Sequence, residues 1–122
     1  MAYAEPAGVA APRVVRALVA MLAHEDQAAA ERAAALLRLF PSESHGPLAR
    51  ALRTGSAPDV RRRAVQALGA CRQDAAVAAL VTALGDPAPS VRAAAPRALG
   101  DMRDPASNLG AGFGLVAQRS PG

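Results

Sequence analysis

The sequence predicts an all-α fold, a right-handed α-solenoid (an αα-superhelix) of about three helix pairs with a partial fourth, from two observations. The first is an internal repeat: VRRRAVQALG at residues 60–69 recurs as VRAAAPRALG at residues 91–100, and the segments start 31 residues apart. Such a period is typical of a solenoid, whose units bury their apolar faces only against their neighbours. The second is composition: alanine fills 33 of 122 positions and aromatic residues only 2%, which favours closely packed helices over strands.

The first unit is expected at residues 12–41, after a flexible tail over residues 1–11 that is rich in Ala, Gly and Pro. Pro12 suits the first turn of a helix, and apolar residues follow it at helical spacing. The polar segment at residues 24–26 interrupts the pattern, and its acids favour the start of a second helix that ends near Leu39. This helix holds a weaker copy of the repeat, in which Ala33, Leu36 and Leu37 correspond to Ala64, Ala67 and Leu68.

The second unit is expected at residues 42–70, beginning with a turn at residues 42–46 and a short helix opened by Pro47. A break at residues 54–56 precedes a helix that starts at Pro58 and stops at Gly69, since glycine commonly follows a helix end.

The third unit is expected at residues 71–100, with Asp74 as the N-cap of its first helix. Its second helix ends at Gly100, and Pro96 inside that helix predicts a kink. A stub from residue 101 resembles the opening of a fourth unit, and the glycine-rich residues 106–122 are expected to form a flexible tail.

The turn segment Asp86-Pro87-x-x-x-Val91-Arg92, followed by Ala98-Leu99-Gly100 and Asp104-Pro105, resembles the HEAT-like repeat family. The resemblance covers about residues 12–105 and is to the short bacterial form of the family, which is also seen in phycobilin-lyase-type repeat proteins. It implies a ladder in which a turn aspartate and a helix arginine pair along the stack, roles that fall to Asp86 and Arg92. Arg61 matches the arginine one unit earlier, but Gly55 stands at the aspartate position, so the expected ladder is incomplete.

Helical periodicity places Arg62 and Gln66 opposite the apolar stripe of their helix, and Arg97 on the matching face one unit later. A solenoid of this kind offers a binding surface rather than an enclosed catalytic pocket, so we expect non-catalytic protein binding on the ridge of second helices. Arginine is a frequent interface anchor. The residues expected to contact the partner are Glu31, Arg61, Arg62, Arg63, Gln66 and Arg97.

An excess of arginine in the middle of the chain leaves other interpretations open. Residues 44–73 contain six arginines and one acid, Asp59, in a chain of net charge +4. Such a cluster is compatible with a solvated face, an acidic protein partner or nucleic-acid phosphates. The segment has no aromatic residue to stack on bases, which weighs against nucleic acid. The resemblance to phycobilin-lyase-type repeats also implies a further alternative, a bilin-lyase-like accessory role.

The residues that carry metal and redox chemistry are too sparse to predict a cofactor or a catalytic centre. His24 and His45 are far apart in sequence, and the single cysteine, Cys71, lies on the apolar stripe as a small hydrophobic residue. We therefore expect no enzyme activity, cofactor or metal. The chain shows no long apolar segment or signal peptide, and a cytoplasmic location is expected. Apolar end faces of so short a stack also predict self-association.

Overall fold

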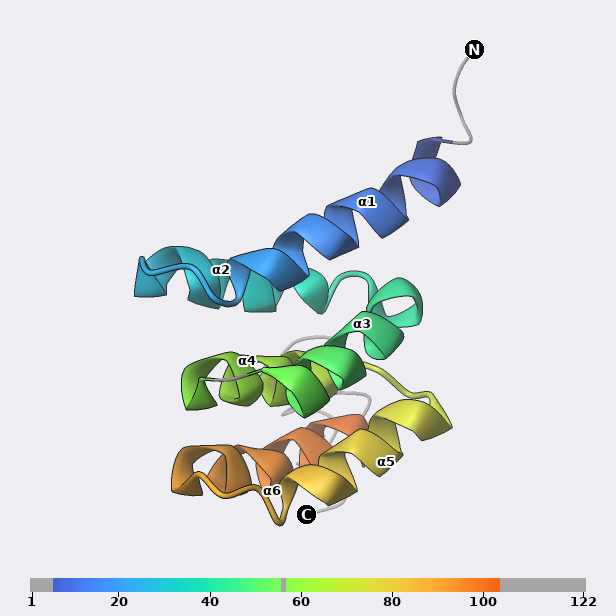
Figure 1. Ribbon diagram of the computed structural model, residues 1–122. Helices are drawn as coiled ribbons and strands as arrows, with labels where there is room; N and C mark the ends of the chain where they lie inside the picture. Colours follow the sequence, from blue (N-terminus) through green and yellow to red (C-terminus); the bar gives the residue numbers. More distant parts are fainter. Residues whose placement is uncertain (1–5, 56, 104–122) are drawn as a thin grey trace, which may run out of the picture.

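The computed structural model describes residues 6–55 and 57–103, with side chains from Pro12 onward. In these ranges the chain is helical and forms no strand. The helices in order are α1 (Pro6–Met21), α2 (Gln27–Leu37), α3 (Pro41–Thr54), α4 (Pro58–Leu68), α5 (Asp74–Ala83) and α6 (Pro89–Arg103). Successive helices run in roughly opposite directions (Figure 1).

The helices stack in two layers, as expected for a helical solenoid. Helices α1, α3 and α5 contact one another in sequence and form the first-helix layer. Helices α2, α4 and α6 do the same and form the second-helix layer. Each helix of one layer also packs against its chain neighbour in the other layer.

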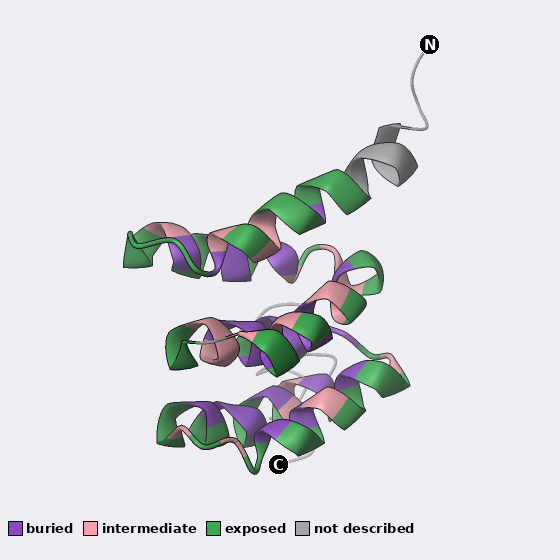
Figure 2. Cartoon of the chain, viewed as in Figure 1, coloured by how far each residue is buried: buried purple, intermediate pink, exposed green. Residues whose placement is uncertain are grey.

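The core lies between the two layers and is built from alanine and leucine (Figure 2). The apolar stripe expected on α4 is buried, with no exposed surface on Ala64, Ala67 or Leu68. Small alanines let the helix axes approach closely, and leucines fill the space that remains. Larger residues in the fully buried core are Val15, Leu22, Leu37, Leu48, Val65, Leu80 and Val91.

Two helices start earlier than the sequence patterns indicate. Helix α1 begins at Pro6, so part of the segment expected as a tail is helical, while residues 1–5 lie outside the described residues. The turn expected at residues 42–46 is wrong, because those residues form the first turns of α3. Pro41 occupies the first turn of α3, where a missing N–H is tolerated. The buried Ser44 then donates a hydrogen bond of 3.4 Å to the Leu37 carbonyl, which fixes this turn against α2.

Helices α4 and α6, with the C-cap of α4, contain two glycines and a proline at positions where the sequence patterns predict a helix end or a kink. Gly69 is the C-cap of α4, and its φ of −60° is one that any residue can adopt. The backbone conformation therefore does not explain why glycine stands here. A Cβ at Gly69 would lie 3.2 Å from the Ala98 Cα, which shows how closely α4 and α6 approach there. Helix α6 continues through Pro96 and Gly100 to Arg103. The remainder of the expected stub and the tail at 106–122 lie outside the described residues.

Asp74 is not the N-cap of α5, as the sequence predicts, but its first residue. The N-cap is Gln73, without a side-chain capping hydrogen bond. An acid in the first turn still stabilises the helix through its dipole. In the first unit, Asp26 caps α2 and accepts a hydrogen bond of 3.0 Å from the Ala28 amide.

Candidate functional site

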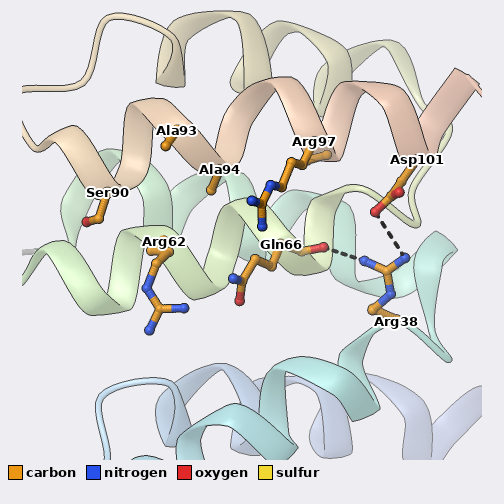
Figure 3. A pocket seen from close by; sticks show the side chains of 9 residues that line it. Arg38, Arg62, Gln66, Ser90, Ala93, Ala94, Arg97 and Asp101 are labelled. Atoms are coloured by element: carbon orange, nitrogen blue, oxygen red, sulfur yellow. Dashed lines mark hydrogen bonds and ion pairs between the residues drawn. The ribbon is translucent and has the colours of Figure 1, made fainter.

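A groove of about 470 Å³ lies on the second-helix layer, between α4 and α6 (Figure 3). Three residues expected to bind a partner line it together: Arg62 and Gln66 from α4, and Arg97 from α6. Its floor on α6 is made of small side chains. The other lining residues are Arg38, Ser90, Ala93, Ala94, Ala98 and Asp101.

Charges around this groove are unequal, because its lining contains three arginines and one acid, Asp101. Arg38 donates a hydrogen bond to the Gln66 carbonyl, and its Nη2 lies 3.7 Å from the Asp101 carboxylate. The exposed Arg97 makes no ion pair or hydrogen bond through its side chain with any residue of the described part of the chain. The excess positive charge creates a potential that attracts anions.

The first and second units are joined by a cluster of one acid and two arginines. The Glu31 carboxylate accepts hydrogen bonds of 2.9 Å from Arg62 Nη2 and 2.8 Å from Arg63 Nε. Arg63 Nη1 also donates a hydrogen bond of 2.9 Å to the Leu22 carbonyl, just after the end of α1. The Arg63 side chain is only 4% exposed. The hydrogen bond from Arg63 is the main cause that lowers the pKa of Glu31. Arg63 is therefore engaged within the stack.

The second and third units are joined by a bidentate ion pair between Arg61 and Asp86. Arg61 Nε and Nη2 donate to the two carboxylate oxygens over 2.9 and 3.0 Å, and the side chains are 14% and 8% exposed. This hydrogen bonding lowers the pKa of Asp86 and raises that of Arg61. A side chain held in this way stabilises the stack and offers little surface to a partner.

The ladder expected from Asp86 and Arg92 takes a different form, since Asp86 pairs with Arg61 from the preceding unit. The Asp86 carboxylate also accepts a hydrogen bond of 2.9 Å from the Ala88 amide, and this bond fixes the turn before α6. Arg92 Nη1 instead donates to the carbonyls of Asp86 and Pro87 over 2.9 and 3.0 Å. Arg61 Nη1 closes its own loop in the same manner, on the Gly55 carbonyl at 3.0 Å. Arg61 and Arg92 thus each tie their own loop, and of these two arginines only Arg61 forms an ion pair with a carboxylate of the described residues.

The residues expected to bind a partner therefore fall into two groups. Arg62, Gln66 and Arg97 meet at the groove, and Glu31 lies beside them with its side chain 44% exposed. Arg61 and Arg63 are not among the residues that line the groove, and their ion pairs connect units instead.

Sequence reasoning missed Arg38 and Asp101 as groove residues. Asp101 stands four positions after Arg97 and so shares its helix face. It was missed because the helix was expected to stop at Gly100.

Cys71 is buried without exposed surface, which confirms the sequence interpretation of a small core residue. Its Sγ lies 3.8 Å from the Ser44 hydroxyl, and burial raises the pKa of the thiol. His24 is exposed in the loop before α2, and its Nδ1 accepts 2.9 Å from the Asp26 amide. No group of His, Cys, Asp or Glu within the described ranges is arranged to hold a metal ion.

Comparison with known proteins identifies the family of the chain. The sequence model of HEAT repeats matches residues 46–108, just over half of the chain, and the match includes every groove residue except Arg38. The chain belongs to the HEAT repeat family, whose members generally mediate protein–protein interactions and are typically non-enzymatic scaffolds. A search of curated proteins found no matching sequence. Across residues 6–55 and 57–103, no helix has the length and apolarity that a membrane crossing requires.

Proposed function

We propose that this protein is a non-catalytic scaffold that binds a partner protein on its second-helix layer, across the groove between α4 and α6. The observation that carries the proposal is the meeting of Arg62, Gln66 and Arg97 at one groove from two adjacent units. The Arg61–Asp86 ion pair holds these two units together, and the Glu31 cluster ties the second unit to the first. Because the units are fixed before binding, association costs little ordering entropy.

The handedness of the stack and its number of helix pairs are part of the same proposal. We infer a right-handed superhelix of three helix pairs followed by a partial fourth, on the strength of the 31-residue repeat. A bacterial origin in the short repeat form, a likeness to phycobilin-lyase-type repeats and a cytoplasmic location stay predictions of the sequence.

Nucleic-acid binding through the arginine cluster is the main rival. Phosphate binding scales with the number of basic side chains that reach the surface. Arg61 and Arg63 donate to Asp86, Glu31 and backbone carbonyls, which removes two cations from any such surface. This favours a protein partner over a phosphate backbone.

Two other roles have weaker support. A bilin-lyase-like task would profit from a reactive thiolate, and burial raises the pKa of the Cys71 thiol instead. Self-association is supported by apolar side chains that stay exposed on α5 and at its C-cap, in the last helix pair of the described stack: Val77, Val81 and Leu84. Sizing chromatography at several concentrations tests it, and a single unchanged elution volume would rule it out.

The partner proposal is tested by quantitative affinity capture from the source organism with three versions of the chain. The test variant is Arg62→Ala with Arg97→Ala, and the control is Arg50→Ala with Arg53→Ala, two exposed arginines of α3. We expect a protein that the wild type and the control retain and the groove variant loses. Unfolding of each version is measured in parallel, since Arg62 also contacts Glu31. Equal retention by all three versions would reject the groove as the binding site.

A further inference from the structure

The two interfaces within the second-helix layer differ in one set of equivalent positions. The 31-residue repeat makes positions 31, 62 and 93 equivalent, and likewise positions 32, 63 and 94. At the interface of α2 with α4, position 31 supplies an acid, and Arg62 and Arg63 reach back to it. At that interface one carboxylate is engaged by two guanidinium groups.

The interface of α4 with α6 has the opposite composition. The acid position is now held by Arg62 itself, and the two arginine positions hold Ala93 and Ala94. Both alanines line the groove. The groove therefore occupies the space that arginine side chains fill one unit earlier, and the carboxylate of that earlier interface has no counterpart on α4.

Arg97 and Gln66 then add donors to this space. Arg97 reaches from α6 towards Gln66 on α4, and its side chain has no ion pair among the described residues (Figure 3). The equivalent position on α2 is Ala35, so this cation is absent from the earlier unit. Asp101, the acid of the groove, is already engaged by Arg38. The donors at the centre of the groove are left to a ligand.

We propose that the groove binds an acidic, extended segment of the partner, with an Asp or Glu carboxylate held by Arg97 and the Gln66 side-chain amide. The inference rests on the proposed protein-binding function and names the chemistry of the partner. The ligand carboxylate supplies between α4 and α6 what Glu31 supplies between α2 and α4. The volume of about 470 Å³ falls within the range of about 300–1,000 Å³ that is usual for ligand sites.

An acidic peptide fits this groove better than a nucleic acid does. Stacking of bases requires aromatic side chains, and the groove lining contains alanines instead. The Asp101 carboxylate lies at one end of the groove and repels a continuous phosphate chain, but an isolated carboxylate further along avoids it.

The test is fluorescence anisotropy with a labelled peptide of alternating Glu and Ala, compared with Gln/Ala and Lys/Ala peptides of the same length. We expect only the acidic peptide to bind, and more weakly as salt rises. Arg97→Gln should weaken binding by about tenfold or more, because a charge-assisted hydrogen bond is lost. Ala93→Glu places a carboxylate in the groove from α6 and should abolish binding. Glutamate forms helices well, so α6 should stay folded.

Controls separate this inference from the proposed function. Arg50→Gln removes one exposed arginine of α3, outside the groove, and should leave the affinity unchanged. Equal binding of the neutral peptide, or of the acidic peptide to Arg97→Gln and Ala93→Glu, would overturn the inference. Tighter binding of a single-stranded DNA oligonucleotide would overturn it in favour of nucleic acid. If peptide binding fails but capture of a partner still depends on Arg62 and Arg97, only the carboxylate chemistry is rejected.

Discussion

Arg61 and Asp86 connect consecutive helix pairs through two hydrogen bonds of 2.9 and 3.0 Å. Both residues are largely withdrawn from solvent, and the Asp86 carboxylate fixes the turn before α6 as well. The arginine at position 61 is therefore part of the stacking interface, although it belongs to a run of three arginines that looks like one surface patch.

Replacing Arg61 should destabilise the stack. Arg61→Ala leaves the largely buried Asp86 carboxylate without its partner, at a cost of about 1–3 kcal/mol in the free energy of unfolding. Urea denaturation measures the change. Arg72→Ala, at an exposed position, should stay within about 0.5 kcal/mol of the wild type. In a double-mutant cycle with Asp86→Ala, strict additivity of the two losses would contradict a direct interaction.

Stability should fall in acid through Asp86 and Glu31. Arginine hydrogen bonds lower the pKa of both carboxylates in the folded state, from ordinary values of 3.8 and 4.5. Their contribution is therefore complete above those values and is lost as the pH falls through the lower folded pKa values. Urea unfolding at a series of pH values from neutral to acidic tests this. The Asp86→Asn/Glu31→Gln variant should be less stable at neutral pH and should lose less on acidification. An equal acid-induced loss in both proteins would count against the prediction.

Gly69 should resist even the smallest substitution. Gly69→Ala would place a methyl group 3.2 Å from the Ala98 Cα and 3.3 Å from its carbonyl oxygen, so the backbone of α6 at Ala98 would have to move by a few tenths of an ångström. We expect a loss of about 1–3 kcal/mol, as for other overpacked sites. Gly100→Ala is the matched control, because its methyl group meets nothing within 4 Å and alanine favours the helix by about 1 kcal/mol. Thermal melting should lower the midpoint for the first variant and raise it for the second, and the reverse order would refute this packing.

Cys71 should be unreactive in the folded protein. The thiol has no exposed surface, and burial raises its pKa, so little thiolate is present at neutral pH. A colourimetric thiol reagent should react slowly with the native chain and at once in denaturant. Rapid reaction of the native chain would show that the contact between α3 and the segment after α4 opens readily.

The repeat and the helical periodicity were sufficient to predict an all-helical stack and the buried stripe of Ala64, Ala67 and Leu68. Turn-forming residue types gave a wrong prediction where contacts between helices determine the backbone conformation. Ser44 and Gly46 look like turn residues, yet the hydrogen bond of Ser44 to the Leu37 carbonyl holds them in α3.

The run of Arg61, Arg62 and Arg63 was misleading for a geometric reason. Successive residues on a helix point about 100° apart. Arg61 therefore pairs with Asp86, Arg62 lines the groove and reaches Glu31, and Arg63 donates to the Leu22 carbonyl. The missed groove residues Arg38 and Asp101 come from segments whose ends only the three-dimensional structure defines.

Chemical-shift mapping tests the central claim, that partners bind in the groove between α4 and α6, most directly. The 15N-labelled chain is titrated with the acidic peptide while its backbone amide signals are followed. The largest shifts should cluster at residues 62–66 and 90–101, and Ala93→Glu should remove them. Shifts concentrated on α3 and α5, or at the exposed Val77 and Val81, would contradict it.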